Sequence, residues 1–170
     1  MAAEQIFLNF SADKLLQLAS RIGTCLDKLS DGQIWARHSD NENAIGNLVL
    51  HLCGNVRQWI GTGVAGLPDI RERDREFAAR GGYGCGELKE RLRRTIEAAA
   101  EQIRKLPPER LEEITRIQNY QVTRLEAIYH VVEHFSQHAG QIIFATKLLT
   151  SEDLGFYAHL KQAAHTETVP

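Results

Sequence analysis

The segment from Thr123 to Leu149 carries three histidines at four-residue spacing within a pattern typical of one long helix. Residues four apart lie one above the other on a helix face, so His130, His134 and His138 fall on one side of it. The predicted inward stripe follows spacings of three and four residues, and its members are Ala127, Val131, His134, His138, Ile142, Ala145 and Leu149. His130 falls about 40° to the side of His134, at the edge of this stripe. Two imidazoles therefore occupy positions that we expect to face a protein core.

Three further segments have apolar stripes of helical period. Together with the segment above, they predict an all-α fold, a four-helix bundle that forms one domain over residues 1–170. The four predicted helices cover residues 11–29, 43–60, 87–106 and 123–149. Ser11 is the predicted N-cap of the first helix, and a capping box of Thr123 and Glu126 begins the fourth. We also expect a short helical turn at 153–160.

The glycine-rich segment 61–86 separates the second and third predicted helices. A connection this long is usually functional or mobile, and it would allow the two helices to run parallel. Its glycines match neither GxGxxG nor GxxxxGK[ST], which argues against a nucleotide-binding loop. We therefore expect a long crossover connection here, and a second connection at 107–122 with a short extended piece at 114–117.

Composition narrows the class of protein. The 170 residues include 20 Lys and Arg against 22 Asp and Glu, and the sequence has no basic cluster of the kind that nucleic acids need. The N-terminus lacks a signal-peptide pattern, and no stretch is long and apolar enough to span a membrane. The cysteines, Cys25, Cys53 and Cys85, form no CxxC pair, so we interpret them as free thiols. We expect a cytoplasmic protein that binds neither nucleic acid nor membrane.

A third histidine, His51, lies at the border of the apolar face of the second predicted helix, in a polar strip that faces inward. A buried imidazole needs partners for both ring nitrogens, and a stacked pair doubles this need. A divalent metal ion on His51, His134 and His138 would meet it and would leave coordination positions open, as in catalytic sites. The alternative is that these imidazoles form hydrogen bonds with Asn47, Gln58 or neighbouring hydroxyls.

Other histidine motifs fit the sequence less well. His130-Val-Val-Glu133-His134 has the HxxEH form of inverted zinc peptidases, but Glu133 points about 100° away from His134. His134 and His138 have the HxxxH spacing of the zincins without their glutamate. No glutamate precedes a histidine by three residues, as a di-iron carboxylate bundle requires. The remaining histidines, interpreted as surface residues, are His38, His159 and His165.

Two segments together resemble the DinB-like (YfiT-like) metal-binding four-helix bundles. They read Asn47-Leu-Val-Leu-His51-Leu-Cys-Gly-Asn55 and Val132-Glu-His134-Phe-Ser-Gln-His138-Ala-Gly-Gln141. The resemblance covers the chain from the first predicted helix through Leu149. It implies a bundle with a long crossover, commonly a homodimer, that binds nickel or zinc through His51, His134 and His138 but not through His130.

The characterised members of that family are thiol-dependent transferases or isomerases that use low-molecular-weight bacterial thiols such as bacillithiol or mycothiol. Many relatives have His-Arg-Gly-Gln where this chain has His138-Ala-Gly-Gln, so this chain has one positive charge fewer near the site. The leading hypothesis is a metal-dependent thiol S-transferase that acts on a small-molecule thiol and an electrophile. Candidate contacts to the ligands or the substrate are Asn47, Asn55, Gln58, His130 and Gln141.

Two alternatives stay open on the sequence. The first is a metal-dependent hydrolase, in which the ion activates water. The second is a metal-stabilised bundle without catalysis, which serves in binding or in a stress response. No general base is evident in the sequence for either kind of enzyme.

Overall fold

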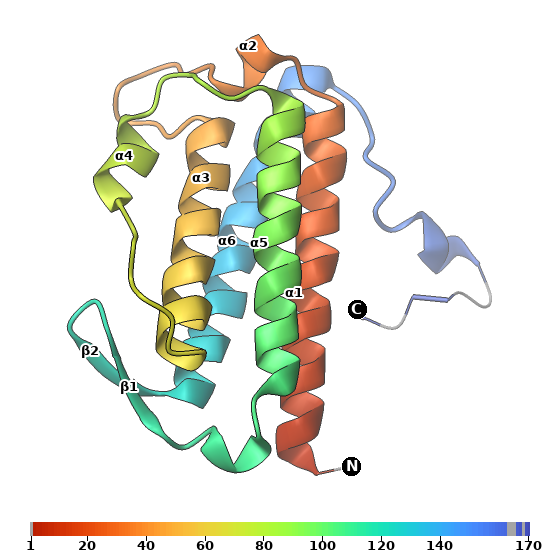
Figure 1. Ribbon diagram of the computed structural model, residues 1–170. Helices are drawn as coiled ribbons and strands as arrows, with labels where there is room; N and C mark the ends of the chain where they lie inside the picture. Colours follow the sequence, from red (N-terminus) through yellow and green to blue (C-terminus); the bar gives the residue numbers. More distant parts are fainter. Residues whose placement is uncertain (1, 163–165, 168) are drawn as a thin grey trace.

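The computed structural model describes residues 2–162, 166–167 and 169–170, and this part of the chain is mostly helical with one two-stranded sheet (Figure 1). The long helices lie side by side and are α1 (Ala3–Asp27), α3 (Ile45–Val56), α5 (Cys85–Lys105) and α6 (Arg124–Thr150). The shorter elements are α2 (Asp31–Ile34), the π-helix η1 (Arg57–Val64), α4 (Arg73–Ala78), the 3₁₀ helices η2 (Pro108–Arg110) and η3 (Ala158–Lys161), and the strands β1 (Ile114–Ile117) and β2 (Tyr120–Thr123).

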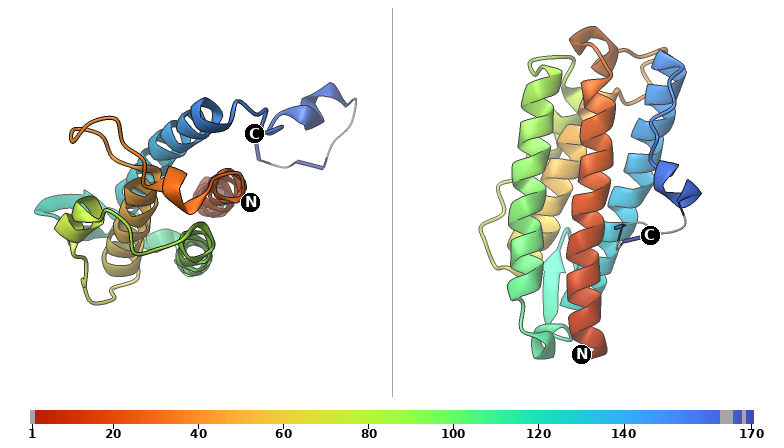
Figure 2. Two further views of the ribbon diagram at one scale, coloured as in Figure 1. Left: turned by 90° about the horizontal axis from the view of Figure 1, so that it is seen from above. Right: turned by 90° about the vertical axis from the view of Figure 1, so that its right-hand side faces the viewer.

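The long helices do not simply alternate in direction along the chain, as they would in an up-and-down arrangement. In Figure 1, α3 and α5 run in one direction, while α1 and α6 run in the other. The chain between η1 and α5 therefore returns along the outside of α3, and α4 forms part of this return (Figures 1 and 2). We call residues 65–84 the crossover segment. The predicted crossover between the second and third long helices is thus present, with a short helix that the sequence pattern did not indicate.

The core lies between the long helices and consists mainly of aliphatic side chains, together with Phe135, Trp59 and two cysteines. Its largest fully buried members include Leu8, Leu15, Ile22, Leu52, Ile60, Leu92, Ile96 and Phe135. On α6, the buried face is formed by Ala127, Ile128, Val131, Phe135, Ala139, Ile142 and Thr146. The predicted inward stripe is therefore displaced. Leu149 is exposed, and His134, His138 and Ala145 are half-buried at the edge of the core.

Helix boundaries differ from the prediction at the start of the chain. Helix α1 begins at Ala3, eight residues before the predicted N-cap, and Ser11 is buried within it. Leu8 is fully buried and extends the apolar stripe toward the N-terminus, which explains the early start. The capping box of the fourth helix is correct, because the Thr123 side chain accepts from the Glu126 amide and the Glu126 carboxylate accepts from the Thr123 amide.

A β-hairpin joins α5 to α6 and departs from the all-helical prediction. The extended piece at 114–117 is β1, which pairs with β2 in an antiparallel register that joins Ile117 to Tyr120. Gln118 and Asn119 form the turn with φ of 51° and 66°, a left-handed pair suited to a two-residue hairpin. The hairpin packs closely on η1, because a Cβ at Gly63 would lie 2.2 Å from Cδ1 of Ile117.

The C-terminal segment contains less helix than predicted. Instead of a turn over 153–160, the structure has only η3, at Ala158–Lys161. His38 is exposed and His159 is half-buried, while His165 lies outside the described residues. Within the described ranges, no helix combines the length and apolar character needed to cross a membrane.

Candidate metal centre

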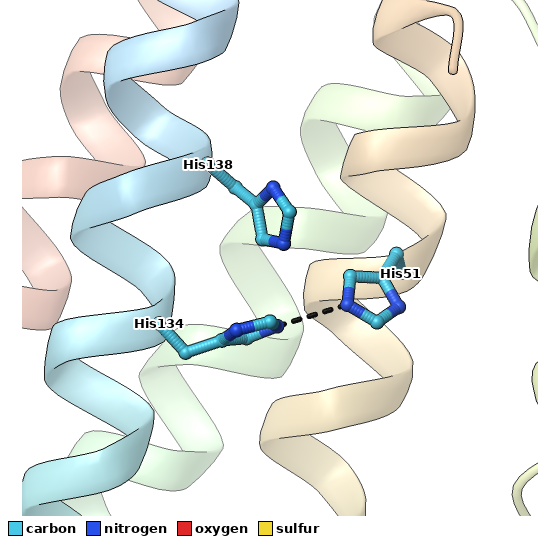
Figure 3. A group of neighbouring side chains, drawn as sticks. All are labelled: His51, His134 and His138. Carbon is cyan, nitrogen blue, oxygen red and sulfur yellow. Dashed lines mark hydrogen bonds between the residues drawn. The ribbon is translucent and has the colours of Figure 1, made fainter. Parts of the chain in front are cut away.

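Three histidine side chains from two helices converge on one point between α3 and α6 (Figure 3). His51 projects from α3, and His134 and His138 project from successive turns of α6. Nε2 of His51 lies 2.9 Å from Nε2 of His134, and one ring nitrogen from each histidine falls within 4.8 Å of the others. These are the three residues that the sequence predicted as ligands. The spacing is short enough for a single ion to contact all three.

The rings meet edge to face, which turns their nitrogens toward a common centre. The ring centroids of His51 and His134 lie 5.0 Å apart with planes at 75°, and those of His134 and His138 lie 4.5 Å apart with planes at 88°. His51 is 6% exposed, whereas His134 and His138 are half-buried. The cluster therefore has one histidine in the interior and two at the border of the core.

Hydrogen bonds to the other ring nitrogens determine which atoms face the centre. Nδ1 of His51 lies 3.2 Å from Oε2 of Glu76, and Nδ1 of His138 lies 2.7 Å from Oε1 of Gln141. Both partners are oxygens that accept, so each Nδ1 carries the proton and each Nε2 keeps its lone pair. The carboxylate behind His51 is the arrangement that commonly orients a metal-binding imidazole and raises its basicity.

Glu76 is itself held by Arg71, and both side chains are nearly buried. Arg71 donates through Nε to Oε1 of Glu76 at 2.9 Å and through a terminal nitrogen to Oε2 at 2.8 Å. That terminal nitrogen also lies 3.1 Å from Nδ1 of His51, but both groups are donors, so the carboxylate is the partner they share. Burial acts to raise the pKa of Glu76, yet hydrogen bonds and charge from Arg71 and His51 outweigh it and lower this pKa.

The imidazoles on α6 are suited to binding cations because they stay neutral. Burial, followed by the neighbouring His138, His51, His130 and Arg71, lowers the pKa of His134 to about 4. Burial likewise lowers the pKa of His138, although Gln141 opposes this effect. At neutral pH both rings therefore have a free lone pair, which a metal ion needs and a proton would block.

The predicted contact residues divide into two groups. Asn47 is fully buried, and its side-chain nitrogen donates to the carbonyls of Glu76 at 2.8 Å and Ala79 at 3.0 Å rather than to a histidine. Gln58 accepts from Arg71 at 2.9 Å and donates to Asp69 at 2.7 Å. Both residues thus fix the crossover segment to α3 and η1. The side chains that bond to the imidazoles are therefore Glu76 and Gln141 rather than the predicted Asn47 and Gln58.

Gln141, Asn55 and His130 lie nearer the cluster. Gln141 contacts His138 directly, as described above. The His130 ring stacks on His134, with centroids 5.5 Å apart and planes at 22°, and it is not among the three converging residues. Asn55 is 4% exposed and follows His51 by one turn of α3. Glu133, the acidic residue of the rejected HxxEH motif, is exposed and bonds to Gln137.

Sequence reasoning missed the residues that the crossover segment contributes. Besides Arg71 and Glu76, Phe77 contacts His51, with ring centroids 4.7 Å apart, and the Arg73 guanidinium lies 4.8 Å from the Phe77 centroid. In the sequence these residues belong to a charged run, 69–76, inside a glycine-rich connection. This pattern does not indicate which of the side chains turn toward the histidines. Gly54, one turn from Leu50 on α3, provides the space that Glu76 occupies.

A separate cavity of about 970 Å³ lies behind this network, between the crossover segment, η1 and α5. Gln58, Arg71 and Glu76 line it, but the three histidines do not. The Arg71–Glu76 pair therefore separates the histidine cluster from this cavity.

The fold and the cluster define a mostly helical protein with three histidines close enough to bind one metal ion. The chain belongs to the family described as "Protein of unknown function (DUF1572)", whose model matches residues 2–160. Its fold is similar to that of a conserved protein from Enterococcus faecalis known from a crystal structure, with a TM-score of 0.70 and 16% sequence identity over 89% of this chain and 99% of that one. No curated protein matches the sequence.

Proposed function

We propose that this protein is a DinB-like four-helix bundle that binds a divalent metal ion, nickel or zinc, through His51, His134 and His138. The observation that carries the proposal is the convergence of three imidazole nitrogens within 4.8 Å, with the Nδ1 atoms of His51 and His138 already bonded to oxygens. Three neutral nitrogen donors match the ligand preference of these ions. The carboxylate on His51 supports the same conclusion.

We further propose that the centre serves a thiol S-transferase. A divalent ion held there would lower the pKa of a coordinated thiol, so that the sulfur could react with an electrophile. The half-buried His134 and His138 leave the cluster accessible to small molecules. Arg73, which is exposed and lies over the ring of Phe77, supplies a positive charge that can attract an anionic substrate. A cytoplasmic location is consistent with the three free cysteines.

The hydrolase alternative has less support. A metal-dependent hydrolase commonly uses a carboxylate or imidazole with a free acceptor as general base. Among the described residues, Glu76 is the carboxylate that contacts the cluster, and both its oxygens accept from Arg71. A protein in which the ion serves only stability remains the competing proposal, and it predicts metal binding without turnover.

Metal analysis of protein purified without chelators tests the first step. We expect about one equivalent of divalent metal per chain, since a site with three convergent ligands should retain its ion. His134→Ala should lose the metal, and His38→Ala, on an exposed histidine, is the matched control. Less than half an equivalent in the wild-type protein would contradict the metal site.

Incubation with an electrophile and a panel of low-molecular-weight thiols tests the second step. We expect at least one thiol to support turnover in the metal-loaded protein, and His51→Ala to abolish it. A metal-loaded protein that shows no turnover above this variant with any thiol would favour the non-catalytic alternative.

A further inference from the structure

Two buried polar atoms beside the histidine cluster have no hydrogen-bond partner. They are the indole nitrogen of Trp59, a donor, and the side-chain oxygen of Asn55, an acceptor. Both residues are 4% exposed. A buried polar group without a partner is unfavourable, so each of these two atoms calls for a partner such as an ordered water, an ion or a ligand.

The positions of the two residues place these atoms on the side of α3 that faces α6. Asn55 follows His51 by one helical turn, and Trp59 follows Asn55 by one more. His51 contacts His134, and the Trp59 ring lies 4.2 Å from the ring of His130, one turn before His134 on α6. Asn55 therefore lies between two contacts to α6 and adjoins the cluster.

The backbone at this position is unusual as well. Trp59 lies in the π-helix η1, and π-helical turns occur frequently at functional sites. The hairpin covers this part of η1: Tyr120 lies 6.3 Å from Trp59 between ring centroids, and Gln118 donates to Gln58 at 2.6 Å. Tyr120 is largely exposed, so the edge of this region is in contact with solvent.

We propose that Asn55, Trp59 and His130 form a subsite for a secondary amide group of a small-molecule ligand. The amide carbonyl would accept from the Trp59 indole, and the amide N–H would donate to the Asn55 oxygen. A secondary amide offers its donor and acceptor on different atoms, which suits two side chains whose backbone positions differ by about 6 Å along the helix. The His130 ring forms the wall between this subsite and His134.

The subsite extends the proposed function and rests on it in one respect, the identity of the ligand. A thiol that reaches the histidine cluster could place an amide a few bonds from its sulfur against Asn55 and Trp59. The ligand class that the subsite itself selects is therefore a small molecule that carries a secondary amide. Binding of the amide group itself does not require a metal ion.

The indole N–H resonances provide a direct test. The chain has two tryptophans, so a proton–nitrogen NMR spectrum shows two indole signals, and Trp59→Phe identifies the relevant one. Trp35 is the internal control, because its indole already donates to the Tyr83 carbonyl at 2.9 Å. The probes are N-acetylcysteamine, with thiol and amide, N-ethylacetamide, with the amide alone, and propanethiol, with the thiol alone.

We expect both amides to shift the Trp59 signal saturably in chelator-treated and in metal-loaded protein, and propanethiol to leave it unchanged in chelator-treated protein. Asn55→Leu should weaken amide binding about five- to tenfold, the effect of one lost hydrogen bond, and its spectrum reports whether it is folded. In chelator-treated protein, a Trp59 signal unmoved by both amides, or moved equally by propanethiol, would overturn the subsite. Because the N-ethylacetamide titration needs no metal, this result is distinguishable from a failure of the metal proposal.

Discussion

The carboxylate of Glu76 occupies the space next to Gly54 where any other residue would have its Cβ. A Cβ at position 54 would lie 1.8 Å from Oε1 of Glu76, so the carboxylate would have to move away from its present position. Glu76 is also the residue that bonds to Nδ1 of His51. The absence of one side chain on α3 thus allows the crossover segment to reach a metal-ligand candidate.

Gly54→Ala should therefore displace Glu76 and weaken metal binding. We expect the metal affinity to fall about 10- to 100-fold, as for other losses of a carboxylate behind a metal-binding histidine. A competition titration with a chromophoric chelator measures this change. Gly86→Ala, where a Cβ would meet nothing within 4 Å, is the control and should leave the affinity unchanged. Equal affinities for both variants would show that Glu76 does not act on His51.

Arg71 and Glu76 should show strong energetic coupling. Arg71→Met leaves a nearly buried carboxylate without its main partner, and we expect unfolding free energy to fall by about 3 kcal/mol. Adding Glu76→Gln removes that charge and should restore about 2 kcal/mol. Chemical denaturation of the metal-free variants measures both values. The exposed pair of Arg75 and Glu72 is the control, since Arg75→Met should cost less than about 1 kcal/mol.

The thiol of Cys85 should be unreactive at neutral pH although it is only partly buried. Burial, followed by the Asp31 carboxylate, raises its pKa to about 11. A raised pKa means that the reactive thiolate forms only as pH approaches 11, so the alkylation rate should rise about tenfold per unit from pH 8 to pH 10. Peptide mapping after timed iodoacetamide treatment measures the alkylation rate of Cys85, and the denatured chain is the control. Alkylation at pH 7.5 as fast as in that control would contradict this pKa.

A homodimer is expected from the resemblance and has a candidate surface. Helix α6 exposes Tyr129, Phe144 and Leu148, each by more than 60% of its area. If this face is the dimer interface, Phe144→Glu should convert the dimer to a monomer in light scattering after size-exclusion chromatography. Leu160→Glu alters an equally exposed leucine on η3 and should have no effect. A wild-type protein that is monomeric at micromolar concentration would contradict the expectation.

The sequence predicted those parts of the molecule that follow a local period. The spacing of His134 and His138, and the polar strip around His51, identified the converging histidines although 83 residues separate His51 from His134. The same spacing placed the imidazoles at the centre of the buried face of α6. In the structure Phe135 and Ala139 occupy that position, so the buried stripe is displaced by one residue from the predicted one.

Residues outside the periodic segments could not be placed in this way. Glu76 and Arg71 reach His51 only because the crossover segment folds back along α3, held by Asn47 and Gln58. No spacing rule connects residue 76 to residue 51. Of the hairpin, the sequence predicted only the extended piece at 114–117. The turn was missed because Gln118 and Asn119 adopt left-handed conformations without the glycine that usually marks such a turn.

The distance along the chain between the converging histidines has a consequence for the unfolded protein. An ion bound to His51 and His134 would close a loop of 83 residues that includes the crossover segment, α5 and the hairpin. A covalent link across such a loop lowers the conformational entropy of the unfolded chain, which stabilises the folded state by about 4.5 kcal/mol. Even a fraction of that value would make the ion a removable cross-link, and a chelator would act on this protein much as a reductant acts on a disulfide-bonded one.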